Sequence, residues 1–110
     1  MIGELFAAFR TEVLALDPNV DEEFLKLYVA YKAETNFVDV VPQAKRLRLS
    51  LNMAYGDIHD PQGLCRDVTN VGRWGNGDVE VALSSLDELP SVMSLVHQAY
   101  DQQMDHGDQV

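Results

Sequence analysis

Near both ends of the chain, apolar residues are spaced three and four apart, which is the pattern of an amphipathic helix. Near the start this stripe consists of Ile2, Leu5, Phe6, Phe9, Val13 and Leu16. Pro18 ends it, because proline disfavours helical geometry in the residue before it. Near the end, Ser85 and Glu88 have the spacing of a capping box, and apolar residues at helical spacing continue to about residue 104. The sequence therefore predicts two terminal helices, with residues 105–110 as a frayed acidic tail.

Between these helices the period of the pattern changes to two, which is typical of half-buried strands. Three segments show it, residues 24–32, 46–53 and 78–83, and the β-branched run at residues 37–41 predicts a further, more central strand. The three strands predicted between residues 24 and 53 are joined by short polar connections, which predicts an antiparallel meander. Residues 54–77 are irregular, and a helical turn is expected over residues 61–68, where Pro61 suits a first helical position.

This order of elements predicts an α+β fold with a four-stranded, mainly antiparallel sheet and both helices packed on one face. Residues 1–104 are expected to form a single domain, because 110 residues is a common domain length. Alternation assigns one set of residues to the covered face: Leu25, Leu27, Val29, Tyr31, Leu47, Leu49, Leu51, Met53, Val79, Val81 and Leu83. The other face would be left to solvent or to a partner.

Charge and composition exclude several classes of function. The net charge of -10 argues against duplex DNA and anionic membranes, because phosphates are held by Lys and Arg. No window approaches the roughly 20 apolar residues of a membrane helix, and the first residues lack the features of a signal peptide, so a cytoplasmic protein is expected. One cysteine and three scattered histidines lack metal-site spacing, so neither a metal nor a cofactor is expected.

The positive charge is concentrated in the middle of the chain. Residues 26–48 carry five Lys or Arg against two acids, whereas residues 74–110 carry seven acids and no Lys or Arg. Strand alternation places several of these cations, with one aromatic, on the predicted open face: Lys26, Tyr28, Lys32, Arg46 and Arg48. Such a face could hold single-stranded nucleic acid, a small acidic ligand or a protein. The alternative is a solvated face whose cations pair with Glu80, Asp78 and Asp39 across strands.

A second candidate is the glycine-rich segment at residues 66–78. Its polar and aromatic side chains, the candidate ligand-binding residues, are Arg66, Asp67, Asn70, Arg73, Trp74, Asn76 and Asp78. The alternative is structural: the ring of Trp74 covers an edge of the core, and the short polar side chains satisfy backbone amides in turns. The glycines do not form a phosphate loop, since the Gly-Lys-Ser/Thr ending is absent.

Side chains that could support catalysis are few, and no catalytic residue is assigned. Asp57, His59 and Asp60 could form an acid and base set, but aspartates followed by proline are typical of a turn. Cys65 follows a leucine and is expected to pack, because a reactive thiol needs a lowered pKa.

Four long motifs lie between residues 24 and 103, at residues 35–43, 46–52, 66–78 and 83–89. In these motifs the chain resembles a bacterial domain family of unknown function whose members often carry the label "predicted transport protein". The resemblance implies a small domain, found alone or at the end of larger proteins, some of which look like nucleases of bacterial defence systems. It brings no active site, and histidine is expected in relatives as readily as arginine at the position of Arg73.

The sequence thus predicts an uncharacterised, non-catalytic domain that binds a ligand or a protein. The expected partner is an unknown protein or a small acidic ligand, and a homodimer is one expected form. The alternative is a small enzyme or a single-stranded nucleic-acid-binding accessory, with Arg66, Asp67, Arg73 and Asp78 gathered into a polar pocket near Tyr31.

Overall fold

The computed structural model describes residues 2–69 and 77–108, with side chains described as far as residue 104. Two helices flank the strands. The elements in chain order are α1 (Ile2–Leu14), β1 (Asp21–Phe24), β2 (Val29–Lys32), β3 (Asn36–Pro42), β4 (Leu47–Leu51), the 3-10 turn η1 (Tyr55–Asp57), β5 (Cys65–Asp67), β6 (Val79–Leu83), the 3-10 turn η2 (Leu86–Glu88) and α2 (Leu89–Asp108).

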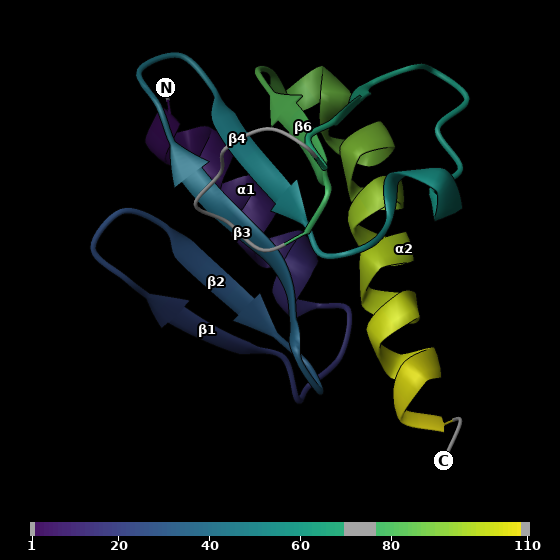
Figure 1. Cartoon of the computed structure of the whole chain (residues 1–110). Helices are drawn as coiled ribbons and strands as arrows, with labels where there is room; N and C mark the ends of the chain where they lie inside the picture. The colour runs from purple at the N-terminus through teal and green to yellow at the C-terminus, as the bar shows by residue number, and fades with distance from the viewer. Residues whose placement is uncertain (1, 70–76, 109–110) are drawn as a thin grey trace.

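All neighbouring strands are antiparallel, and their order in the sheet is β1-β2-β3-β4-β6-β5. Helix α1 lies behind β3 and β4 in Figure 1 and contacts α2, which contacts β3 and β6. The predicted α+β class is confirmed, but the predicted number of strands is wrong, because the described residues form six strands.

The first additional strand arises because residues 24–32 form a hairpin and not one continuous strand. Strand β1 ends at Phe24, the amide of Leu25 donates to the Tyr28 carbonyl (2.9 Å), and β2 begins at Val29. Leu25 and Leu27 therefore lie at the tip of the hairpin and are exposed, contrary to the prediction that they face inward. The turn contains no Gly, Pro or Asn, the residues that usually mark one in a sequence.

The second additional strand is β5, which replaces the helical turn predicted over residues 61–68. Its three residues pair with β6 at the edge of the sheet, with Arg66 opposite Glu80. A strand this short shows no readable alternation, and its conformation depends on the pairing with β6, which lies outside the local segment of residues 61–68.

The core lies between the helices and one face of the sheet. Alternate residues of β4 and β6 are buried there, as predicted, and none of them is more than 2% exposed: Leu47, Leu49, Leu51, Val79, Val81 and Leu83. Each helix adds an edge-to-face aromatic contact. Phe9 of α1 packs on Tyr31 with ring centroids 5.9 Å apart, and Tyr100 of α2 packs on Phe37 at 5.5 Å.

Polar contacts fix the ends of both helices. Asp17 accepts from the Asn19 amide (2.8 Å) and from the hydroxyl of Tyr100, so the α1–β1 loop is held against α2. The bond to Asp17 raises the pKa of Tyr100 to about 12. Before α2, Glu88 accepts from the amide of Ser84 (2.7 Å) and not from that of Ser85, and the side chain of Ser85 makes no capping bond. The predicted capping box of Ser85 and Glu88 is therefore wrong. Helix α2 continues to Asp108, past the predicted end at residue 104.

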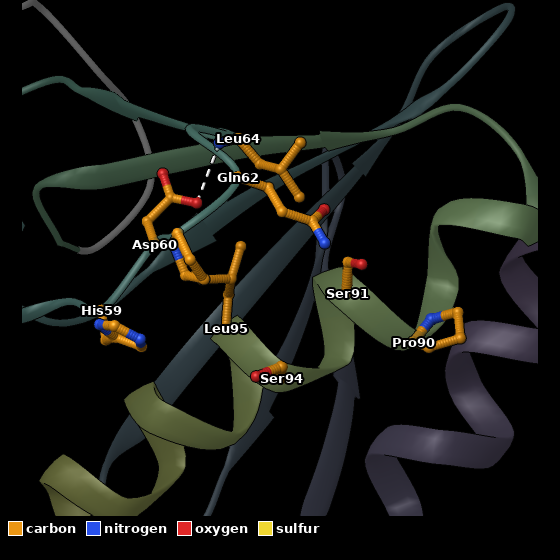
Figure 2. Close-up of a pocket in the computed structure, with 9 residues that line it drawn as sticks. His59, Asp60, Gln62, Leu64, Pro90, Ser91, Ser94 and Leu95 are labelled. Carbon is orange, nitrogen blue, oxygen red and sulfur yellow. Dashed lines mark hydrogen bonds between the residues drawn. The ribbon is translucent and has the colours of Figure 1, made fainter.

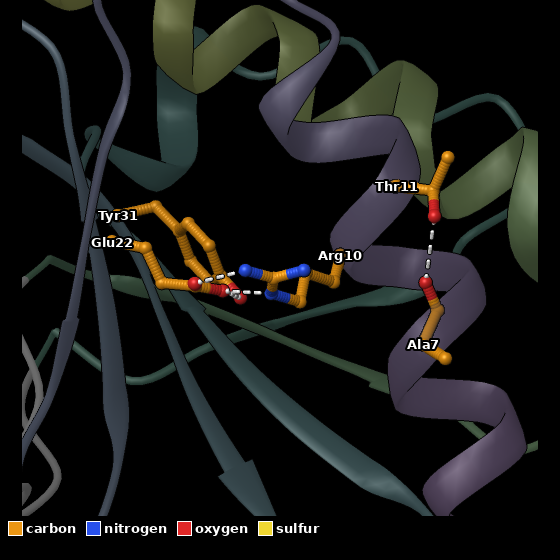
Figure 3. A network of polar contacts seen from close by, with 5 residues as sticks. All are labelled: Ala7, Arg10, Thr11, Glu22 and Tyr31. Atoms are coloured by element: carbon orange, nitrogen blue, oxygen red, sulfur yellow. Dashed lines mark hydrogen bonds and ion pairs between the residues drawn. The ribbon is translucent and has the colours of Figure 1, made fainter.

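A charged network joins α1 to the β1–β2 hairpin (Figure 3). The guanidinium of Arg10 donates to both carboxylate oxygens of Glu22 (2.7 and 2.8 Å), and the hydroxyl of the fully buried Tyr31 donates to Glu22 Oε2 (2.8 Å). The hydrogen bond from Arg10 holds the pKa of Glu22 below its usual range. Burial and the Glu22 carboxylate raise the pKa of Tyr31. These contacts hold β1 and β2 against helix α1.

Candidate binding surface on the charged face of the sheet

Strand parity creates a polar surface on the side of the sheet that faces away from α1 and α2. Because alternate residues of β4 and β6 are buried against the helices, the residues between them point the other way. The strand register places Asp39, Ser50, Glu80 and Arg66 directly opposite one another on β3, β4, β6 and β5. Directly paired residues have Cβ atoms about 4.5–5.5 Å apart, so these side chains form a row. Together with Arg48 they form what we term the charged face.

One carboxylate on this face serves two guanidinium groups. Arg48 Nε lies 3.4 Å from Glu80 Oε2, and Arg66 Nη1 lies 3.3 Å from Glu80 Oε1. Both distances are long for charge-assisted hydrogen bonds, which are usually about 2.7–2.9 Å. The side chain of Arg66 is 68% exposed, so this ion pair contributes little to stability. Glu80 is therefore shared between the two cations.

A third arginine completes a hollow of about 190 Å³, which we call the arginine hollow. It is lined by Arg46, Arg48, Leu64, Arg66, Glu80, Val81 and Ala82. Arg46 is oriented by its Nε, which donates to Gln43 Oε1 (2.9 Å) in the β3–β4 turn. Pockets for drug-sized ligands are usually about 300–1,000 Å³, so this hollow suits a single acidic group. Guanidinium groups match carboxylate and phosphate geometry.

Part of the charged face is closed to solvent. Asp39 is fully buried and accepts a hydrogen bond from Asn36 Nδ2 (2.7 Å), whereas Asn36 Oδ1 is buried without a partner among the described residues. The prediction that Asp39 pairs with cations on a solvated face is therefore wrong about its exposure. The nearly continuous apolar run of residues 37–41 carried the missed signal, because such runs are typical of strands buried on both faces.

The five residues of the predicted sheet-face patch lie in separate places. Tyr28 and Lys32 line a second hollow of about 350 Å³, with Glu23, Leu25, Ala30, Thr35 and Asn36. Lys32 Nζ lies 2.7 Å from Glu23 Oε1. Lys26 is exposed in the turn between β1 and β2, outside both hollows, so its predicted position within a strand is wrong. Arg46 and Arg48 line the arginine hollow.

The candidate segment at residues 66–78 is only partly a loop. Arg66 and Asp67 belong to β5, and Asp78 directly precedes β6. Asp67 Oδ1 accepts from the amide (3.0 Å) and the hydroxyl (2.6 Å) of Thr69, which closes a turn after β5. The remaining candidates lie outside the described residues: Asn70, Arg73, Trp74 and Asn76.

Tyr31 does not belong with this segment. Its side chain is fully buried on the helix side of the sheet, against Phe9, whereas Arg66 lies on the charged face. The predicted polar pocket that combines Tyr31 with Arg66 and Asp67 is therefore wrong. The sequence pattern placed Tyr31 correctly on the covered face, and that position excludes it from a surface site.

Of the residues considered as an acid and base set, His59 and Asp60 line a separate pocket of about 300 Å³, between the loop after η1 and the start of α2 (Figure 2). Asp57 lines a different pocket, so the three side chains do not share one site. Both carboxylate oxygens of Asp60 accept backbone amides, from Leu64 (2.9 Å) and Cys65 (2.8 Å). Burial alone would raise the pKa of Asp60, but these hydrogen bonds outweigh it and the pKa is lowered. Gln98 bonds the amide and the carbonyl of His59 (2.8 and 2.7 Å). In this arrangement Asp60 holds the loop in shape.

The Cys65 thiol is expected to be unreactive. Burial and the adjacent carboxylate of Asp60 raise the pKa of Cys65 to about 12. A raised pKa means less thiolate at every pH below it, and the thiolate is the nucleophile. At about pH 8 we expect iodoacetamide to alkylate the folded protein roughly a thousandfold more slowly than the urea-unfolded chain, because the thiolate fraction falls by about that factor. Mass spectrometry of timed samples measures both rates, and equal rates would contradict this assignment.

The described residues contain no group of three or more His, Cys, Asp or Glu side chains placed to hold a metal ion. No helix among them is long and apolar enough to cross a membrane.

Comparison with known proteins places the chain in a family. The family model described as "Domain of unknown function (DUF5655)" matches residues 2–103. An "Uncharacterized protein" of Haemophilus influenzae (strain ATCC 51907 / DSM 11121 / KW20 / Rd) is 41% identical over 98 residues, which cover 89% of this chain and 32% of that relative. Neither description mentions transport. No solved structure matches the chain. The chain spans about a third of its curated relative, and it belongs to the family of the DUF5655 domain.

Proposed function

We propose that this domain is a non-catalytic binding module that captures a carboxylate of an acidic protein segment in the arginine hollow. The observation that carries the proposal is the grouping of Arg46, Arg48 and Arg66 around the single carboxylate of Glu80. In a chain with only eight Lys and Arg and a net charge of -10, three arginines around one hollow concentrate positive charge. Arg46 and Arg66 are exposed there, so their guanidinium groups can reach an incoming carboxylate.

Size and charge favour a protein segment over a nucleic acid. A hollow of about 190 Å³ accommodates one acidic group. Single strands of nucleic acid are held by aromatic rings alternating with a track of cations. Here Tyr28 lines the second hollow with Lys32, apart from the arginines. The overall charge of -10 also repels a polyphosphate more strongly than a short acidic peptide, whose charge density is lower.

We further propose that the module serves a larger protein. The chain corresponds to 32% of its curated relative, so a protein of that kind has other parts for such a module to serve. The resemblance noted in the sequence adds the proposal that some of these larger proteins are nucleases of bacterial defence systems. The acidic segment then belongs either to the rest of the same protein or to its partner.

The proposal predicts that Arg66→Glu and Arg46→Glu each weaken binding of the peptide Ac-Glu-Glu-Glu-Glu-NH2 by about tenfold or more, because each removes a charge-assisted contact. Both side chains are exposed, so the melting temperature should change little. Titration followed by NMR amide shifts measures the affinity and places the peptide on β4, β5 and β6.

The matched control is Lys26→Glu, which makes the same change of charge at an exposed position outside the hollow. It should weaken binding only slightly, through the long-range field. Equal losses of affinity for Lys26→Glu and Arg66→Glu would show that peptide binding depends only on the net charge of the chain. Such a result would reject the arginine hollow as the site.

A further inference from the structure

The two edge strands of the sheet, β5 and β1, differ in whether other residues cover their outward backbone groups. Strand β5 has only three residues, and its pairing directs the backbone groups of Cys65 and Asp67 away from β6. The amide of Cys65 is already bonded to Asp60 Oδ2 (2.8 Å), and Asp67 leads directly into the turn closed by Thr69. A short edge strand covered by its own loop is a common protection against pairing with other chains. The β5 edge is therefore closed to a further strand.

The opposite edge, β1, has no such cover among the described residues. The amide of Leu25 donates to the carbonyl of Tyr28, so these two residues form a hydrogen-bonded pair. Along an antiparallel hairpin such pairs alternate with pairs whose backbone groups point outward. By this alternation Asp21 and Glu23 bond to β2, whereas the amides and carbonyls of Glu22 and Phe24 point outward from the sheet. Strand β1 is an edge strand, next to β2 alone, and it lies at the outer edge of the sheet in Figure 1.

Apolar side chains surround the end of this edge. Phe24 is 64% exposed, Leu25 39% and Leu27 68%, and together they form the tip of the β1–β2 hairpin. Half of the large apolar side chains that stand exposed in the described residues are these three. Phe24 pairs with the buried Val29, so it lies on the helix side of the sheet, where an added strand would extend the core beyond β1.

The other side of the same edge is acidic. Asp21 and Glu23 lie opposite Lys32 and Ala30 on the face of the sheet away from the helices, and both acids are exposed. Glu23 Oε1 also lies 2.7 Å from Lys32 Nζ, an exposed ion pair that an incoming basic side chain would share. A second copy of β1 would bring their carboxylates against identical ones, and like charges directly opposite are destabilising. A strand with basic residues on that side would instead pair with them. Glu22 faces the helices and is already satisfied by Arg10 and Tyr31.

From these features we propose that β1 accepts an added strand from a partner segment in which basic and apolar residues alternate. The backbone of Glu22 and Phe24 supplies the hydrogen bonds. The basic side chains meet Asp21 and Glu23, and the apolar side chains pack beside Phe24 and the hairpin tip. This is strand addition, in which the backbone gives affinity and the alternating side chains give specificity. It does not depend on the arginine hollow, which lies near the opposite edge of the sheet, on β4, β6 and β5.

The test uses the peptide Ac-Lys-Val-Lys-Val-Lys-Val-NH2 and the whole chain. Binding should shift the amide signals of Glu22 and Phe24 and slow their hydrogen exchange. A peptide of the same sequence with alternate amides N-methylated keeps its charge but cannot pair along one edge, and it should bind at least about tenfold more weakly. The double variant Asp21→Asn, Glu23→Gln should also weaken binding by about tenfold, with its fold unchanged by circular dichroism.

The matched control is Glu4→Gln, Glu12→Gln, which removes two charges from exposed positions of α1 and should leave the affinity within about twofold. Equal binding of the N-methylated peptide, or equal losses for the two double variants, would reduce the interaction to unspecific attraction and overturn the proposal. Dimerisation of the chain alone, with slowed exchange at Glu22 and Phe24, would overturn it in favour of a second copy. Shifts confined to the arginine hollow would overturn it as well.

Discussion

Replacing Phe9 with alanine is expected to lower the free energy of unfolding by about 3–5 kcal/mol, the usual cost of truncating a buried aromatic ring. Phe9 is completely buried and packs edge-to-face on Tyr31, so its loss leaves a cavity between α1 and the sheet. The same cavity would loosen the contact through which Arg10 reaches Glu22. Urea unfolding followed by circular dichroism measures the change.

The control for this variant is Leu86→Ala, because Leu86 is also a large apolar residue but is 48% exposed. Its truncation should cost less than about 1 kcal/mol. If Phe9→Ala were no more damaging than Leu86→Ala, helix α1 could not be packed on the sheet as described.

Replacing Gly77 with alanine is expected to cost about 3 kcal/mol or more, from a position in the chain that looks like an ordinary loop. Gly77 has a positive φ of 102°, and an added Cβ would lie 2.0 Å from the carbonyl oxygen of Leu51 and 2.5 Å from Asn52 Cα. The backbone at the end of β4 would have to move. Thermal unfolding and the amide shifts of Leu51 and Asn52 report the effect.

Gly63 provides the matched control, since it also has a positive φ (65°) but has nothing within 4 Å of an added Cβ. Gly63→Ala should cost only the backbone penalty of about 1–2 kcal/mol. The difference between the two variants therefore measures the close approach of Gly77 to β4. Equal costs would mean that only backbone conformation matters at residue 77.

The sequence predicted those parts of the fold in which burial is one-sided. Residues 47–51 and 79–83 alternate clearly because one face of β4 and β6 meets the helices and the other carries charge. The hairpin at residues 21–32 was missed for a physical reason. Its turn is made of Leu25, Lys26, Leu27 and Tyr28, which continue an alternating pattern and include none of the usual turn residues.

The candidate site was predicted in part, for the same reason. The alternation along β4 predicts that Arg48 points away from the helices, and Arg46 lies beside it because it directly precedes this strand. That Arg66 joins them depends on the pairing of β5 with β6, which no local pattern of residues 61–68 reveals. The burial of Asp39 could have been expected, because the apolar residues on both sides of it are typical of a strand buried on both faces.

The alternation along β4 has a consequence for how members of this family can diverge. Leu47, Leu49 and Leu51 fill the core, and Arg48 and Ser50 between them face outward, so the inner and outer sets are interleaved one by one. An insertion or deletion of one residue in this strand would turn the arginine inward and a leucine outward. Relatives can therefore acquire a new binding preference by substitution of the outward side chains. A shift of the β4 register by one residue would destroy the core, so it is not a route to such a change.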